Sequence, residues 1–174
     1  MTCVDLIVVP DAQTPQRGTL AFGGKTYACV LGRNGVKTDK REGDGATPVG
    51  RFALRRVLYR ADRGAKPATI LDAHAIAPND GWCDAPDDPA YNRPVVLPYP
   101  ASAEVMIRND RLYDVVIVLG HNDAPVRPGA GSAIFLHVMP EDGGPTAGCV
   151  ALAPEDLREV LRGVSADSAV IVRP

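Results

Sequence analysis

Two side chains that could carry out nucleophilic chemistry, His137 and Cys149, lie 12 residues apart in the sequence. His137 ends an apolar run typical of a strand, and a glycine-rich segment, Gly143–Gly148, leads to Cys149. A cysteine attacks a carbonyl as its thiolate, and a free cysteine has a pKa of about 8.5, so this chemistry needs an imidazole that takes the thiol proton. The spacing lets a strand end and a returning loop face each other. We therefore predict a Cys–His pair in which the imidazolium keeps the thiol ionised.

Gly148 directly precedes this cysteine and has no side chain to block an approaching carbonyl. The backbone N–H groups of Gly148 and Cys149 are therefore the expected oxyanion hole. A third group should orient the imidazole, and both Asp142 and a backbone carbonyl near Val138 are candidates. His121 is a rival base.

Two other interpretations of the same residues remain open. A single cysteine is most often a small buried apolar residue, so Cys149 could belong to the core. A zinc hydrolase using His121, His137 and Cys149 is a further alternative. Residue types alone do not decide among these interpretations.

Short apolar runs separated by turns predict a mainly β fold. The 17 glycines and 16 prolines are spread along the chain, which indicates many turns and few long helices. No linker divides the sequence, so we expect one domain over residues 1–174. The predicted strands are Leu6–Val9, Tyr27–Leu31, Phe52–Leu58, Val115–Leu119, Ile134–Val138 and Val170–Val172.

One amphipathic helix is predicted at the C-terminal end, from Pro154 to about Gly163, because its apolar residues share one face. A short second helix is expected over Ala101–Arg108, with Ser102 as its N-cap. Residues 80–100 are rich in Pro and Asp and are expected to form a long irregular loop that could act as a lid. Trp82, in this loop, is expected to anchor it in the core, and His74 is expected to be exposed.

Composition excludes several classes of partner. The chain is 45% apolar and 23% charged with a formal net charge of -2, which gives no electrostatic reason to expect nucleic acid or a membrane surface. The four cysteines form no CxxC pair, and Glu42–Gly45 has too few ligands for calcium, so we expect no metal and a structural turn there. Met1–Pro10 resembles a first strand more than a secretory leader, which favours a cytoplasmic location, or a periplasmic one if a leader has been removed.

Several separated motifs resemble one known family. Ser132–His137 followed by Thr146–Val150 resembles the His…(Ser/Thr)-x-Gly-Cys signature of the L,D-transpeptidase catalytic domain (YkuD) family. Lys40–Gly50 is similar to the family's K-x-E-G-D-x-x-T-P-x-G turn. The resemblance runs from about residue 30 to residue 162, and three further segments are similar to a small single-domain branch: Gly81–Asp84, Tyr91–Val95 and Leu112–Asp114.

This resemblance implies a β-sandwich catalytic domain that acts on peptidoglycan stem peptides without a metal or organic cofactor. It implies Cys149 as nucleophile, His137 as base and Gly148 in the oxyanion turn, with a thioester formed on an L-centre of diaminopimelate type and release of D-alanine. Carbapenem-type inhibitors are expected to bind. Many family members carry Arg or Asn two residues after the nucleophile, where this chain has Ala151.

Arginine side chains are the natural partners of the carboxylates of a stem peptide. Arg93 is the first candidate and Arg108 the second. Tyr91, His121 and Asn122 are further candidates for substrate contact at the rim of the site.

The resemblance leaves the acyl acceptor open. Water would give an L,D-carboxypeptidase, which we favour on the sequence as part of murein recycling, since a cytoplasmic chain meets only soluble stem peptides. An amine would give an L,D-transpeptidase that forms cross-links. A non-catalytic module that binds wall peptides is the alternative from another class.

Overall fold

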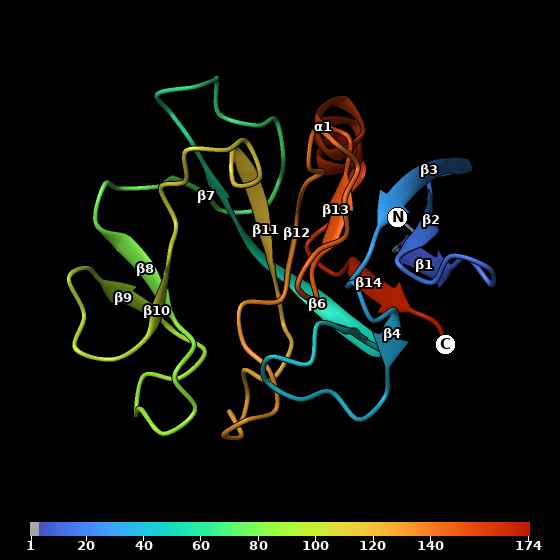
Figure 1. Ribbon diagram of the computed structural model, residues 1–174. Coiled ribbons are helices and arrows are strands. Elements are labelled where there is room, and N and C mark those ends of the chain that lie inside the picture. The colour runs from blue at the N-terminus through green and yellow to red at the C-terminus, as the bar shows by residue number, and fades with distance from the viewer. Residues whose placement is uncertain (1–3) are drawn as a thin grey trace.

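The computed structural model describes residues 4–174 and has the mainly β architecture that the sequence predicts (Figure 1). Nine strands form the main sheet, and all six predicted strands are among them. In spatial order they are β11 (Val115–Leu119), β12 (Phe135–Val138), β13 (Val150–Leu152), β3 (Lys25–Val30), β2 (Arg17–Phe22), β1 (Leu6–Pro10), β14 (Ala169–Val172), β6 (Gly50–Tyr59) and β7 (Ala73–Ala75).

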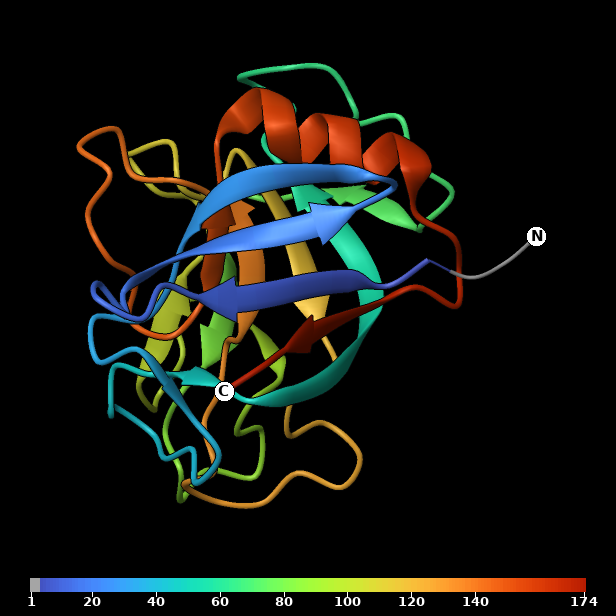
Figure 2. The ribbon, with the colours of Figure 1, turned by 90° about the vertical axis from the view of Figure 1, so that its right-hand side faces the viewer.

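The main sheet curls round and closes on itself, because β6 pairs with β11 as well as with β14. Its inner faces enclose the larger hydrophobic core, and Figure 2 shows α1 (Pro154–Gly163) lying across the curved strands. Leu157, Val160 and Leu161 of this helix are buried in that core. The predicted helix is confirmed, with Pro154 in its first turn.

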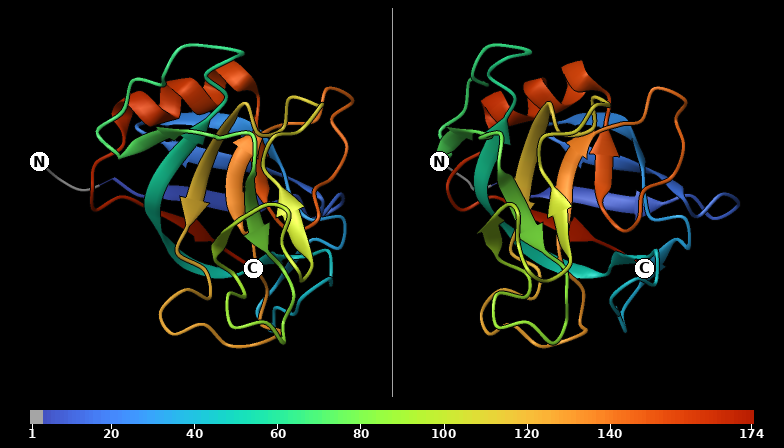
Figure 3. Two further views of the ribbon diagram at one scale, coloured as in Figure 1. Left: turned by 90° about the vertical axis from the view of Figure 1, so that its left-hand side faces the viewer. Right: turned by 60° about the vertical axis from the view of Figure 1, so that its left-hand side comes forward.

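A second sheet of three strands lies against one face of the main sheet (Figure 3). It consists of β10 (Ala103–Val105), β8 (Asp80–Cys83) and β9 (Pro94–Val96), in that order. The expected helix over Ala101–Arg108 is therefore wrong, and so is the expectation that residues 80–100 lack strands. A helix this short is marginal on its own, and pairing with β8 gives the backbone of β10 hydrogen-bond partners. A two-stranded pair, β4 (Val36–Lys37) with β5 (Thr47–Pro48), completes the fold.

Strands β11 and β12 are buried on both faces. Successive side chains of a strand point to opposite sides, so Ile117 and Leu136 face the larger core, while Val116 and Phe135 face the small sheet. The Phe135 ring lies edge-on to Trp82, with ring centres 5.1 Å apart, which confirms Trp82 as an anchor of its segment.

Several further expectations concern single residues. His74 is exposed on β7, as expected. Cys29, Cys83 and Cys149 are free and buried, whereas Cys3 lies outside the described residues. Within residues 4–174, no helix is long and apolar enough to cross a membrane.

Phe135 should hold the two sheets together as one cooperative unit. We expect Phe135→Ala to lower the free energy of unfolding by about 3–5 kcal/mol, because it removes a fully buried ring between them. Chemical denaturation followed by fluorescence and circular dichroism measures this change, with Val105→Ala on the exposed side of β10 as a control expected near zero. Two separate transitions in the unsubstituted protein would contradict a single domain over residues 1–174.

Candidate active site

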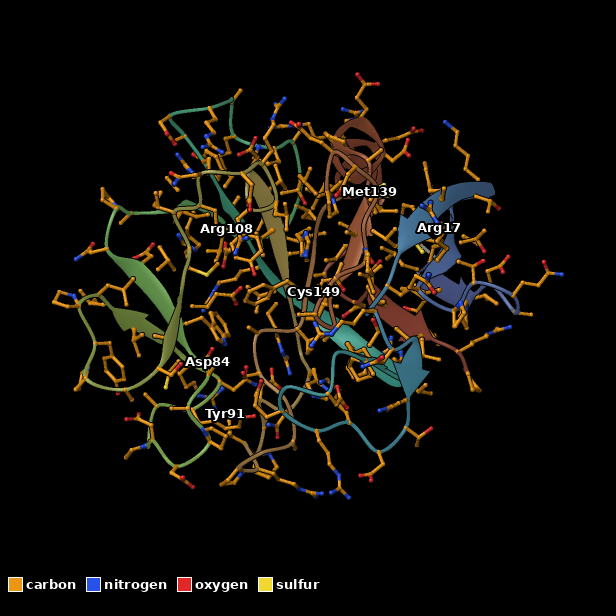
Figure 4. All side chains as sticks on the ribbon, viewed as in Figure 1. Arg17, Asp84, Tyr91, Arg108, Met139 and Cys149 are labelled. Carbon is orange, nitrogen blue, oxygen red and sulfur yellow. The ribbon has the colours of Figure 1, made fainter. Side chains whose placement is uncertain are left out.

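A cavity of about 350 Å³ holds both predicted catalytic side chains. It lies between the small sheet, strand β12 and the loop before β13. Figure 4 shows Cys149 near the middle of the molecule, with Arg108 and Asp84 on the side of the small sheet. The cavity walls include Cys149, His137, Tyr113, Glu104, Arg108, Asp84, Glu42, Lys40 and Ser132.

Cys149 is held by the turn that precedes β13. The Thr146 hydroxyl donates to the Cys149 carbonyl at 2.6 Å and accepts from the Gly148 N–H at 3.1 Å. Gly148 has φ 146°, and a Cβ there would lie 2.9 Å from the Ala46 carbonyl oxygen, so both conformation and space require glycine. In the empty site the Gly148 N–H is bonded to Thr146, so its expected part in an oxyanion hole stays a prediction.

The Cys149 thiol is bonded to the backbone of the segment before β12. Its Sγ donates to the Ala133 carbonyl at 3.2 Å and accepts from the Phe135 N–H at 3.4 Å. Only 8% of the residue is exposed. The sulfur therefore faces the cavity from a fixed position.

His137 is oriented by its own strand. Its Nδ1 donates to the Val138 carbonyl at 2.7 Å, which leaves Nε2 as the nitrogen able to accept a proton. The Tyr113 ring lies edge-on to the imidazole, with ring centres 5.5 Å apart. The orienting group is thus the backbone carbonyl, and Asp142 instead accepts from the Gly144 N–H.

Burial disfavours the charged form of both members of the pair in the empty site. It raises the pKa of Cys149 to about 12, with the charge of Glu104 adding to the effect, and it lowers the pKa of His137 to about 4. Among the hydrogen bonds of residues 4–174, none joins the imidazole to the thiol. These pKa directions favour a neutral pair over the expected standing thiolate in the empty site, because desolvation disfavours both charged forms.

The wall opposite Cys149 carries carboxylates that sequence reasoning missed. Glu104 on β10 accepts from the Tyr113 hydroxyl at 2.6 Å, and burial raises its pKa, with Asp84 and Glu42 also contributing. The Asp84 Oδ1 is buried without a hydrogen-bond partner. Glu104 lies in the segment that was expected to be a helix, and no sequence pattern placed it in the cavity.

Two cations of this wall are already paired. Arg108 lies 2.6 Å from Asp110 and 5.1 Å from the centre of the Tyr113 ring, and Lys40 lies 2.5 Å from Asp44. Arg108 thus lies in the cavity, as the sequence analysis expected of a substrate contact. Lys40 belongs to the turn that was interpreted as structural.

The other four residues expected to contact substrate do not line this cavity, so their contact with substrate stays a prediction. Arg93 donates to the Asp123 carbonyl at 2.7 Å, and the buried Tyr91 hydroxyl donates to Glu42. His121 and Asn122 line a different cavity, of about 310 Å³. These polar side chains find partners in their own loops, which no sequence pattern indicated.

The positions of the side chains also bear on the two alternatives, His121 as base and a zinc site. The His121 Nε2 lies 2.9 Å from the Ala130 carbonyl oxygen, away from Cys149, so it is not placed to act as base. Within residues 4–174, no three His, Cys, Asp or Glu side chains are grouped as metal ligands. Ala151, at the position where many family members have Arg or Asn, is fully buried and pairs with His137 across β12 and β13.

Comparison with known proteins agrees with the motifs. The family model for the L,D-transpeptidase catalytic domain, YkuD, matches residues 7–172. No curated protein matches the sequence. Solved structures similar to this chain include L,D-transpeptidase 1 of Mycobacterium tuberculosis (14% identity, TM-score 0.39) and an L,D-transpeptidase from Mycobacterium smegmatis (14% identity, TM-score 0.45).

The alignments to these two structures cover 97% and 98% of this chain but only 62% and 59% of theirs, so it spans about three fifths of their length. The family match, in contrast, covers nearly the whole sequence and contains both cavity residues, His137 and Cys149. The chain therefore belongs to the YkuD family of L,D-transpeptidase catalytic domains.

Proposed function

We propose that this chain is a cysteine acyltransferase that acts on peptidoglycan stem peptides through a thioester on Cys149. The observation that carries the proposal is the single cavity that holds Cys149 together with His137, whose Nδ1 is tied to a backbone carbonyl so that Nε2 can take a proton. A histidine held in this way is prepared to act as a base.

The proposed reaction uses the neutral pair directly. The thiol proton passes from Cys149 Sγ to His137 Nε2 as the sulfur attacks the carbonyl of the third stem residue. The resulting imidazolium then protonates the departing D-alanine nitrogen, which breaks the peptide bond and leaves a thioester. The Cys149 N–H is the proposed donor to the oxyanion, since the Gly148 N–H is bonded to Thr146.

The charges of the cavity suit a zwitterionic substrate. A diaminopimelate side chain ends in both an ammonium and a carboxylate group. Asp84 offers a carboxylate for the ammonium, and Arg108 offers a guanidinium for the carboxylate. The unpartnered Asp84 Oδ1 is an acceptor that a bound cation would satisfy.

For the second half-reaction we propose transfer to an amine, which forms a cross-link. The supporting observation is the carboxylate of Glu104, which would attract an incoming ammonium group to the cavity that holds the thioester. This group loses a proton to become the attacking amine. Hydrolysis, the L,D-carboxypeptidase reaction favoured by the sequence, is the alternative, and it would suit the cytoplasmic location that the sequence analysis favoured. In both reactions the first product is the same acyl-enzyme.

Cys149 should be the site of covalent labelling by a carbapenem. We expect the intact protein to gain the mass of one carbapenem, and Cys149→Ala to gain none, because Cys29 and Cys83 are buried away from the cavity. Mass spectrometry of the intact protein and of its peptides measures this. A non-catalytic binding module would show no adduct in either protein.

The pH dependence of acylation should reveal the buried imidazole. We expect kcat/KM for a stem tetrapeptide to fall about tenfold per pH unit below pH 4, because a protonated His137 cannot accept the thiol proton and burial lowers its pKa to about 4. Between pH 6 and 9 the rate should be nearly flat with respect to this pair. His121→Gln should leave the acid limb unchanged, and an acid limb near pH 6.5 would contradict the account.

Glu104 should influence which acceptor reacts. With a disaccharide tetrapeptide as donor and acceptor, we expect Glu104→Gln to lower the ratio of cross-linked dimer to tripeptide by several fold, since the attraction for the ammonium group is lost. Mass spectrometry of the products gives this ratio, with Glu141→Gln, outside the cavity, as the matched control. If tripeptide forms in the unsubstituted enzyme and dimer never does, the acceptor is water.

A further inference from the structure

Asn92 is a buried side chain whose every polar atom is bonded. Its Oδ1 accepts from the Trp82 Nε1–H at 3.0 Å and from the Ala133 N–H at 3.0 Å. Its Nδ2 donates to the carbonyls of His121 at 3.0 Å and Asn122 at 2.8 Å. One side chain, 4% exposed, thus joins the small sheet, the loop after β11 and the segment before β12. A fully satisfied buried network of this kind fixes the relative position of its members.

The segment that Asn92 holds has a strained backbone. Ala133 has φ 52°, the left-handed region, which costs an alanine roughly 1–2 kcal/mol. Three hydrogen bonds hold this segment. Besides the Ala133 N–H bond to Asn92, the Gly131 N–H donates to the Tyr91 hydroxyl and the Ser132 hydroxyl donates to Glu42. Such a conformation persists only where its surroundings enforce it.

The consequence of this conformation lies at the nucleophile. The Ala133 carbonyl is the acceptor of the Cys149 thiol, at 3.2 Å, so the angles that Asn92 enforces also decide where this oxygen points. A hydrogen bond from the S–H stabilises the neutral thiol, and a carbonyl oxygen beside the sulfur disfavours the thiolate. The thiol proton is therefore held by Ala133 in the empty site and must leave it to reach His137.

We propose that Asn92 is a positioning residue that locks the Ala133 peptide in its left-handed conformation and thereby holds Cys149 as a hydrogen-bonded neutral thiol. The proposal rests on the proposed function only in taking Cys149 as the nucleophile. Asn92 acts through Ala133, because it does not line the cavity. The hydrogen bond from the Ala133 N–H to Asn92 also fixes the position of the sulfur for attack. Its loss should therefore free the S–H group and slow acylation.

The S–H stretching band of Cys149 reports this hydrogen bond directly, as the Raman difference between each protein and its Cys149→Ala partner. Asn92→Gly is the matched variant, since glycine accepts the φ of 55° at this position while it removes the amide. We expect its S–H band to move to the higher frequency of an unbonded thiol, and acylation by a carbapenem to slow at least tenfold.

Trp82→Phe is the control, because it removes the other donor to the same Oδ1 atom and leaves the bond to Ala133 in place. We expect it to keep the S–H band and the acylation rate of the unsubstituted protein, even if it unfolds more readily. Ala133→Pro removes the same hydrogen bond on the Ala133 side, since proline has no N–H, and it fixes φ near −65°. It should reproduce the S–H band expected for Asn92→Gly, and it provides the test of the proposal if Asn92→Gly does not fold.

A folded Asn92→Gly or Ala133→Pro protein with an unchanged S–H band would overturn the assignment. An equal loss of acylation in Trp82→Phe would also overturn it, because the effect would then belong to the network as a whole. If the unsubstituted protein takes no carbapenem while the band shifts as expected, the proposed function fails and the role of Asn92 stands.

Discussion

The site depends on one constraint, the burial of β11 and β12 on both faces. Their inward side chains fill the closed main sheet, and their outward side chains are covered by the small sheet. His137 lies on the outward face, at the edge of this covered zone, and β13 runs parallel to β12 so that Ala151 is its neighbour. The proposed catalytic pair therefore lies where two apolar cores meet, and the small sheet supplies the opposite wall of the cavity.

This placement sets the protonation of the pair. Removing water disfavours both a thiolate and an imidazolium, so burial favours a neutral thiol and a neutral imidazole in the empty site. The charges of the proposed reaction would then arise only during attack, where the Cys149 N–H would stabilise the oxyanion. A thiol held in this way is also protected from non-specific alkylation and oxidation, because the rates of both reactions rise with the thiolate fraction and with exposure.

The sequence predicted the strands and the helix that have strong apolar patterns. It missed the strands that form only because they pair with another strand. Short apolar runs predicted β11, β12 and β14, and Pro154 with its apolar face predicted α1. Residues 101–108 have no such pattern, and only pairing with β8 makes Ala103–Val105 a strand. The spacing of His137 and Cys149 indicated the pair. The contacts of Arg93 and Asn92, in contrast, depend on loops about 30 to 40 residues away, which one sequence does not reveal.

Direct titration of the Cys149 thiol is the sharpest test of a neutral buried pair. The ultraviolet absorbance of the thiolate can be followed from pH 5 to 9 as the difference between the unsubstituted protein and Cys149→Ala. The account predicts no thiolate signal across this range, because burial raises the pKa of Cys149 to about 12. A thiolate signal present at pH 7 and lost in His137→Gln would show a standing ion pair and contradict it.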